Sequence, residues 1–212
     1  MPVAANPFKA ALRKEIKAAV RALSAERKRL QSEVIAKKVS SPIFDEAKRI
    51  SIYLSTSDEV DTIDILREMF RLRKHVFVPT YKNELMEMVR LHGMEDYERL
   101  PLTKWNIKQP NFEECRENVL DKGGLDLCIL PGVAFTLDGG RLGHGMGYYD
   151  CYLIRHFEKY PNKFAPAGNI SEKLAAKKTI LIGLALKEQI VDRRKLPLEP
   201  HDVPLDAVFT SD

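Results

Sequence analysis

Residues 131–150 read P-G-V-A-F-T-L-D-G-G-R-L-G-H-G-M-G-Y-Y-D, and five glycines lie between positions 139 and 147. A mostly apolar run, Leu125–Leu130, precedes these glycines, and an aromatic, amphipathic run, Tyr148–Tyr160, follows them. The order strand, glycine loop and helix is typical of phosphate binding, because glycines let backbone N–H groups approach an anion and a helix N-terminus adds unpaired donors. Arg141 could pair with phosphate oxygens, and Asp150 could hold a magnesium ion.

The spacing of these glycines differs from the two best-known phosphate loops. Gly140 and Gly145 are spaced as in a Walker A loop, but Met146 and Gly147 stand where Lys and Ser or Thr are required. A Rossmann fingerprint that began at Gly143 would need a glycine at position 148, which is a tyrosine. The glycines alone are equally typical of a plain tight loop.

Runs with helix and strand patterns alternate along the chain. Asn6-Pro7 predicts a helix start, since Asn is a good N-cap and Pro fits the first helical position. A second helix is predicted from near Ser24, and it should turn Leu30, Val34 and Ile35 inward. Further helices are predicted at 61–73 and 149–160, and strands at 50–54, 75–79, 86–91, 125–130, 179–186 and 207–210. Such alternation predicts an α/β fold, a three-layer α/β/α sandwich with a mostly parallel open sheet and a small antiparallel extension around 80–92.

We expect one domain over residues 1–212, with the N-terminal helices 7–40 packed on the sheet and a polar loop at 161–178. Ligands of open α/β sheets bind beyond the carboxyl ends of the strands. The loops after strands 50–54 and 125–130 are therefore expected to form the walls of the site. Glu59 should then lie beside the glycine loop, although the two are far apart in sequence.

Composition indicates the class of protein and its compartment. Of the 212 residues 44% are hydrophobic, which suffices for a sizeable core, and no run approaches the roughly 20 apolar residues of a membrane span. We therefore expect no membrane partner. The first residues lack an apolar signal core, and three cysteines without a C-x-x-C motif suit a reducing compartment. These features predict a cytoplasmic protein, and the basic, amphipathic residues 8–21 leave a mitochondrial presequence as the alternative.

The net charge of +4 is unevenly distributed, since residues 1–40 hold ten Lys and Arg against three Asp and Glu. A basic arm of this kind could bind nucleic acid. No aromatic residues that could stack on bases interleave with these charges, so a solvated helix face explains them better. We expect no nucleic-acid partner.

The string P-G-V-A-F…D…G-x-R-L-G-x-G-x-G-Y-Y-D closely resembles the signature of the 5-formyltetrahydrofolate cyclo-ligase family, also called 5,10-methenyltetrahydrofolate synthetases. The resemblance extends over most of the chain, through the following segments: Lys9…Arg13, Arg49–Glu59, Trp105–Pro110, Gly123–Leu127, Lys187–Ile190 and His201–Asp206. It implies an ATP- and Mg²⁺-dependent enzyme that converts 5-formyltetrahydrofolate to 5,10-methenyltetrahydrofolate with release of ADP and phosphate. In that reaction ATP phosphorylates the formyl oxygen, and N10 closes the ring. The folate could be polyglutamylated, and we expect a monomer.

The resemblance also implies roles for individual residues. The residues expected to bind ATP are Lys9, Arg13, Arg141, Leu142, Gly143, His144, Gly145, Met146, Gly147, Tyr148 and Tyr149. Those expected to bind the folate are Leu54, Glu59, Trp105, Tyr148 and Tyr149. Arg141 and Tyr148 are the expected catalytic residues, and Asp150 and Asp202 the expected magnesium ligands.

Each assignment has a structural alternative. Lys9 and Arg13 share one helix face at i, i+4 spacing and could be solvated charges. Asp150 could be a charge that stabilises a helix N-terminus, Asp202 a surface turn residue and Trp105 a core residue. His144 and Met146 depart from the motif, because some relatives carry Arg or Lys there.

The sequence is also compatible with three other functions. The same phosphate loop could serve another ATP-dependent kinase or ligase, the basic arm could bind nucleic acid, or the chain could be a non-catalytic folate-binding relative. The retained Arg141, Tyr148, Tyr149 and Asp150 argue against the last of these.

Overall fold

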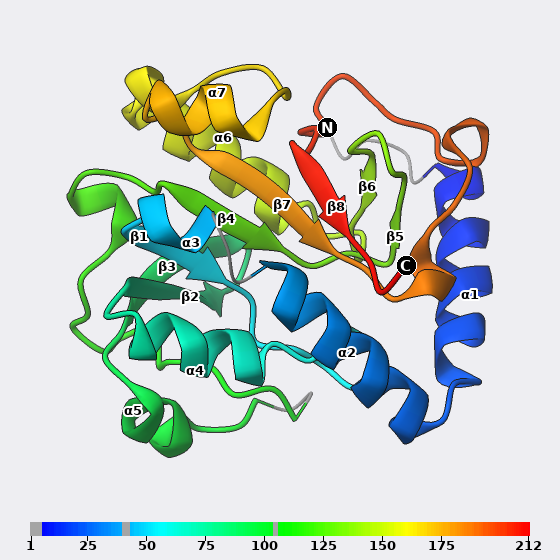
Figure 1. Ribbon diagram of the computed structural model, residues 1–212, viewed down its shortest axis with the longest axis horizontal. Helices are drawn as coiled ribbons and strands as arrows, with labels where there is room; N and C mark the ends of the chain where they lie inside the picture. The colour runs from blue at the N-terminus through cyan, green and yellow to red at the C-terminus, as the bar shows by residue number, and fades with distance from the viewer. Residues whose placement is uncertain (1–5, 40–42, 104–105) are drawn as a thin grey trace.

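A six-stranded sheet in the order β3-β2-β1-β4-β7-β8 divides the molecule (Figure 1). The computed structural model describes residues 6–39, 43–103 and 106–212. The strands of this sheet are β1 (Arg49–Ile52), β2 (His75–Lys82), β3 (Leu85–Leu91), β4 (Leu127–Leu130), β7 (Ile180–Leu184) and β8 (Ala207–Phe209). Every neighbouring pair is parallel except β2 and β3. The predicted antiparallel extension is therefore the β2–β3 hairpin.

The central strands carry the core. Every residue of β4 and β7 is buried, as is β1 after its first residue. Parallel strands covered on both faces read as continuous apolar runs, because each side chain meets a helix layer on one face or the other. Ser51 and Cys128 are partners in the register of β1 and β4, and both are fully buried.

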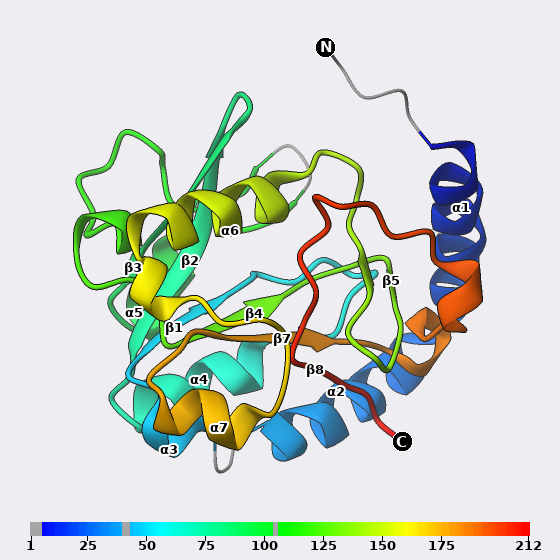
Figure 2. The same cartoon turned by 90° about the horizontal axis from the view of Figure 1, so that it is seen from above.

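Helices cover both faces of the sheet and complete the predicted three-layer α/β/α sandwich (Figure 2). One face is covered by α6 (Tyr148–Lys159), and the other by α2 (Ala25–Val39), α3 (Ile43–Glu46), α4 (Ile63–Arg71) and α7 (Ile170–Ala175). Helix α1 (Pro7–Arg21) stands at the β8 end of the molecule and contacts β5 (Ala134–Phe135) and the 3₁₀ turn η3 (Lys187–Gln189). The remaining elements are the short α-helix α5 (Met94–Arg99) and the 3₁₀ turns η1 (Val119–Asp121), η2 (Pro161–Lys163) and η4 (Arg193–Lys195). Across the described ranges, no helix has the length and apolar character needed to cross a membrane.

Helix α1 starts as predicted, because the Asn6 side chain accepts hydrogen bonds from the Phe8 and Lys9 amides. The predicted inward face of α2 is wrong at two positions. Leu30 is 48% exposed and Val34 39% exposed, whereas the buried residues of this helix are Gln31, Ser32, Ile35 and Val39. The two polar residues are buried because they bind backbone groups of neighbouring segments: Gln31 accepts from the Lys187 amide and Ser32 from the Asp61 amide.

The glycine-rich segment contains a small hairpin that the sequence patterns did not predict. β5 pairs antiparallel with β6 (Arg141–Leu142), and Gly139 and Gly140 lie in the connecting turn. A Cβ at Gly139 would lie 2.3 Å from the Leu205 carbonyl oxygen, and one at Gly140 would lie 2.5 Å from Thr136 Oγ1. These two glycines therefore serve close packing, and the loop that remains for ligand binding is 143–147.

His156 fastens α6 to the sheet. Its side chain is fully buried, and its Nε2 accepts a hydrogen bond of 3.0 Å from the Leu125 amide. Its Nδ1 has no hydrogen-bond partner among the described residues. Burial lowers the pKa of His156 to about 4, and the nearby Lys163 acts in the same direction. The folded protein therefore holds a neutral imidazole here.

The buried imidazole makes stability dependent on pH. Between about pH 6.5 and pH 4 the unfolded chain takes up a proton at His156 that the folded chain does not, so the free energy of unfolding should fall as the pH falls. The pKa difference corresponds to about 3 kcal/mol. His156→Met should lack this component, so the difference in unfolding free energy between wild type and variant, measured in urea at pH 7 and pH 4, should change by that amount. His92→Gln, at an exposed position, is the control. Identical pH profiles for wild type and His156→Met would contradict this account.

Candidate active site

The loop Gly143–Gly147 connects β6 to α6 and forms the centre of the site. Gly145 and Gly147 have φ values of +114° and +69°, a region that residues with a Cβ rarely adopt. Gly147 is the N-cap of α6 and provides no side-chain cap. The first amides of α6 therefore face an exposed loop, which is the arrangement that attracts anions.

Helix α1 closes one side of this loop with Lys9 and Arg13, which share a face as their spacing predicts. Arg13 Nε donates to the Gly143 carbonyl oxygen at 2.8 Å. Lys9 Nζ lies 2.7 Å from Asp202 Oδ2 and 3.1 Å from Glu199 Oε2. The hydrogen bond from Lys9 lowers the pKa of Glu199. Burial lowers the pKa of Arg13, and the two carboxylates oppose that shift. Neither cation is a freely solvated charge.

Arg141 lies beneath the loop in a nearly buried ion pair with Asp150. Its Nη2 is 2.8 Å from Asp150 Oδ2, and the two side chains are 4% and 17% exposed. The other oxygen of Asp150 accepts from the Val203 amide at 3.2 Å. Arg141 Nε is buried and has no hydrogen-bond partner within the described part of the chain. A buried donor without a partner favours an acceptor supplied by a ligand.

The carboxylates gathered here have the chemistry that magnesium prefers. The ligand atoms of Glu199, His201 and Asp202 lie within 4.8 Å of one another. Asp150 reaches the same segment through Val203. The carboxylate oxygens of Glu199, Asp202 and Asp150 fit Mg²⁺, and the His201 nitrogen does not. In the structure Lys9 neutralises Asp202, and Arg141 neutralises Asp150.

Glu59 approaches the loop from the opposite side. It follows β1 and the buried Leu54, and its side chain is 7% exposed. Glu59 Oε1 lies 3.1 Å from His144 Nε2, and Oε2 accepts from the Thr56 amide at 2.9 Å and from Thr56 Oγ1 at 3.0 Å. The neighbouring Asp58 faces α1 and α2 instead, where it pairs with Arg21 at 2.9 Å. The loop after β1 and the loop before α6 therefore meet, as the topology predicts.

The two tyrosines at the start of α6 have different surroundings. Tyr149 is buried, and the Arg141 guanidinium lies 5.8 Å from its ring centre. Tyr148 is half-buried, its hydroxyl donates to the Asn83 carbonyl oxygen at 2.8 Å, and its ring lies 5.0 Å from that of Tyr81. Desolvation raises the pKa values of Tyr81 and Tyr149. Tyr81 could not be recognised in the sequence, because no local pattern shows that β2 continues past Pro79.

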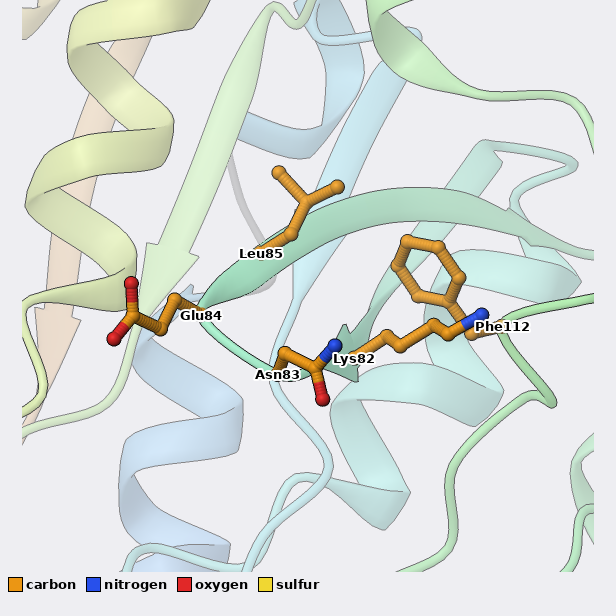
Figure 3. Close-up of a pocket in the computed structure, with 5 residues that line it drawn as sticks. All are labelled: Lys82, Asn83, Glu84, Leu85 and Phe112. Atoms are coloured by element: carbon orange, nitrogen blue, oxygen red, sulfur yellow. The ribbon is translucent and has the colours of Figure 1, made fainter.

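Two open pockets lie around the tip of the β2–β3 hairpin, beside Tyr148. The first has a volume of about 420 Å³ and is lined by Lys82, Asn83, Glu84, Leu85 and Phe112 (Figure 3). The second, of about 390 Å³, shares Lys82 and Phe112 and includes Tyr81 and Gln109. The Lys82 ammonium already has partners within the protein, since it pairs with Glu113 and lies 5.8 Å from the Phe112 ring centre.

Most residues that the sequence analysis selected lie around the 143–147 loop. Arg13 of α1 binds the loop at Gly143, and Lys9 of the same helix binds Asp202. Arg141, just before the loop, pairs with Asp150, just after it. Glu59 contacts the loop at His144. Met146 is 66% exposed at its outer edge. Trp105 lies outside the described residues. Thr56 and Glu199, which the analysis missed, hold Glu59 and Lys9. Only their position three residues from Glu59 and Asp202 could have indicated them.

Comparison with known proteins identifies the family of this chain. The model of the 5-formyltetrahydrofolate cyclo-ligase family matches residues 5–211. The 5-formyltetrahydrofolate cyclo-ligase of Mus musculus is 41% identical over 216 residues, which cover 99% of this chain and 97% of the mouse protein. A probable 5-formyltetrahydrofolate cyclo-ligase of Caenorhabditis elegans is 36% identical and covers 97% of this chain and 94% of its own length.

A solved structure also matches closely. The 5,10-methenyltetrahydrofolate synthetase of Aquifex aeolicus aligns with a TM-score of 0.72 and 29% identity, over 96% of this chain and 90% of its own. The synthetase of Mycoplasma pneumoniae, with a TM-score of 0.67 and 22% identity, shares the fold. The similarity extends over nearly the whole length of the chain. The chain belongs to the 5-formyltetrahydrofolate cyclo-ligase family.

Proposed function

We propose that this protein converts 5-formyltetrahydrofolate and ATP to 5,10-methenyltetrahydrofolate, ADP and phosphate in a Mg²⁺-dependent reaction. One observation carries the proposal: the glycine loop lies between a cationic helix face and a buried carboxylate. Arg13 binds the Gly143 carbonyl oxygen on one side, and Glu59 contacts His144 on the other. A phosphate donor and a pterin bound at these two places would meet across the loop. Action as a monomer, in the cytoplasm and on polyglutamylated folate stays a prediction.

The reaction requires activation of an oxygen that leaves poorly. Transfer of the terminal phosphoryl group to the formyl oxygen creates a phosphate leaving group, and attack of N10 on the activated carbon closes the ring as phosphate departs. No enzyme nucleophile is needed. The protein must bring two substrates together and neutralise charge during phosphoryl transfer.

The nucleotide half of the site is formed by the 143–147 loop and the cations around it. Loop amides and the N-terminus of α6 would bind phosphate oxygens, and the buried Nε of Arg141 offers a donor without a partner in the described structure. Asp150 and Asp202 would hold Mg²⁺, which neutralises phosphate charge. Lys9 and Arg141 bind carboxylates in the structure, but each keeps at least one N–H donor that could bind phosphate without loss of these ion pairs.

The folate half is formed by the loop after β1 and the start of α6. Glu59 can accept two hydrogen bonds from the amino-pyrimidine edge of a pterin, and Leu54 provides an apolar wall beside it. Tyr148, which contacts Asn83 and Tyr81 of the hairpin tip, would contact the folate by family resemblance. Trp105 belongs to this half by family resemblance.

The activity itself can be measured directly. Incubation of the purified protein with (6S)-5-formyltetrahydrofolate, ATP and Mg²⁺ should produce the absorbance of the conjugated methenyl product, with one ADP formed for each product molecule. A chelator should stop the reaction, and added Mg²⁺ should restore it. Absence of methenyl product would refute the proposal, and ADP release that does not depend on folate would favour another kinase.

Lys9 should matter to both stability and nucleotide binding. Lys9→Met leaves Asp202 and Glu199 without their shared cation, and hydrogen bonds to charged groups contribute about 1.5–3 kcal/mol. We expect a loss of that order in unfolding free energy and a rise in the ATP KM of about tenfold or more, with little change in the folate KM. Lys14→Met, at an exposed position on the same helix, is the control. An unchanged ATP KM in a destabilised Lys9→Met would reduce Lys9 to a structural contact.

Glu59 tests the folate half separately. Glu59→Gln keeps the size of the side chain but replaces one acceptor by a donor, so one contact with the pterin becomes repulsive. Folate binding should weaken by about 2 kcal/mol, or roughly 30-fold, and ATP binding should barely change. Calorimetric titration of both ligands provides the measurement. Asp58→Asn, which alters the neighbouring acid that faces away from the loop, should bind both ligands normally. Weaker ATP binding with intact folate binding would show that the two halves have been reversed.

A further inference from the structure

Both carboxylate oxygens of Glu59 have partners in the structure. Thr56 binds Oε2 through its amide and its hydroxyl, at 2.9 and 3.0 Å. His144 Nε2 lies 3.1 Å from Oε1. Because a carboxylate can only accept hydrogen bonds, the His144 nitrogen must act as the donor. A pterin edge that offers two N–H donors therefore meets a carboxylate whose Oε2 is bound by Thr56 and whose Oε1 is bound by His144 of the glycine loop.

The two partners differ in how easily they can leave. Thr56 belongs to the same short turn as Glu59, only three residues away, so its hydrogen bonds are part of the local fold. His144 is held by no such turn. Its side chain is 45% exposed, and it lies between Gly143 and Gly145, where the backbone is least restricted. Displacement of His144 is therefore the smaller rearrangement.

The same residue belongs to the loop that would bind nucleotide. The Gly143 carbonyl oxygen is fixed by Arg13, and Gly147 begins α6, so His144 lies in the short span between two anchors. A phosphate bound to the loop amides would reposition this span. An imidazole is also a hydrogen-bond donor that suits phosphate oxygens. Nucleotide binding and folate binding thus both act on the single contact between His144 and Glu59.

We propose that His144 is a positioning residue that couples the two substrate sites, because it occupies the pterin-facing oxygen of Glu59 until either substrate displaces it. This inference rests on the proposed function. Each substrate then binds more tightly when the other is present, since the first to bind has already broken the contact. Thermodynamic linkage requires the effect to be equal in both directions. One half-exposed hydrogen bond to a charged group limits the coupling to about three- to tenfold.

The test measures folate affinity with and without nucleotide. Binding of 5-formyltetrahydrofolate is titrated calorimetrically in Mg²⁺ buffer, alone and with a saturating non-hydrolysable ATP analogue. In the wild type the analogue should lower the folate Kd by about three- to tenfold. His144→Ala should bind folate that much more tightly without the analogue, and the analogue should then have little further effect. His144→Gln, whose amide nitrogen can still donate to Glu59, should restore the coupling.

A matched variant separates coupling from a general disturbance of Glu59. Thr56→Val removes one hydrogen bond from the other oxygen of the same carboxylate, and it does not touch the glycine loop. It should change folate affinity by the same factor with and without the analogue. Weaker folate binding by His144→Ala, without nucleotide, would overturn the proposal and make His144 a direct folate contact. Equal coupling in wild type and His144→Ala would overturn it as well.

Turnover of the wild type in the same preparation distinguishes failure of the proposed role of His144 from failure of the proposed function. Methenyl product with unchanged coupling in His144→Ala refutes only the role of His144. Absence of methenyl product refutes the proposed function, and this inference with it.

Discussion

The nearly buried ion pair between Arg141 and Asp150 is the contact on which the geometry of the site depends. Arg141 comes from β6, and Asp150 lies in the first turn of α6. Through its second oxygen, Asp150 holds the amide of Val203, and the adjacent Asp202 binds Lys9 of α1. One chain of polar contacts thus joins a strand, two helices and a C-terminal segment around the glycine loop. Removal of one member of a buried ion pair leaves an uncompensated charge, so a change at Arg141 or Asp150 should disturb the other residue as well.

The same contacts solve a problem of charge balance. Lys9, Arg13 and Arg141 all lie around the glycine loop and its neighbours, and without an anion these cations would repel one another. Asp150, Asp202 and Glu199 supply the opposite charge in the structure. The carboxylates that the family resemblance assigns to Mg²⁺ therefore act as counterions for the lysine and arginine. A phosphate ligand with a bound cation would bring both signs of charge and could replace both partners of each pair.

Local sequence patterns predicted the strands and helix start that depend on nearby residues. They failed where contacts between distant segments determine which side chains are buried. The buried runs of β1, β4 and β7 and the N-cap of α1 were predictable, because apolar periodicity and capping act within a few residues. The rule that ligands bind at the carboxyl ends of parallel strands also predicted that Glu59 and the glycine loop would meet. The inward face of α2 was not predictable. Gln31 and Ser32 are buried only because amides of distant segments need their side-chain oxygens. The partner of Lys9 lies 193 residues away, and no local pattern marks such a pair.

Four of the five glycines that first indicated the site serve two different purposes. Gly139 and Gly140 permit the close packing of a hairpin, and Gly145 and Gly147 permit the left-handed backbone of the loop itself. Between them, His144 stands where some relatives carry a longer cation. On sequence grounds this residue is a lost phosphate contact. In the structure its shorter, planar side chain reaches Glu59 across the site instead. The substitution therefore does more than remove charge from the proposed nucleotide half, because it introduces a hydrogen bond that joins the glycine loop to the loop after β1.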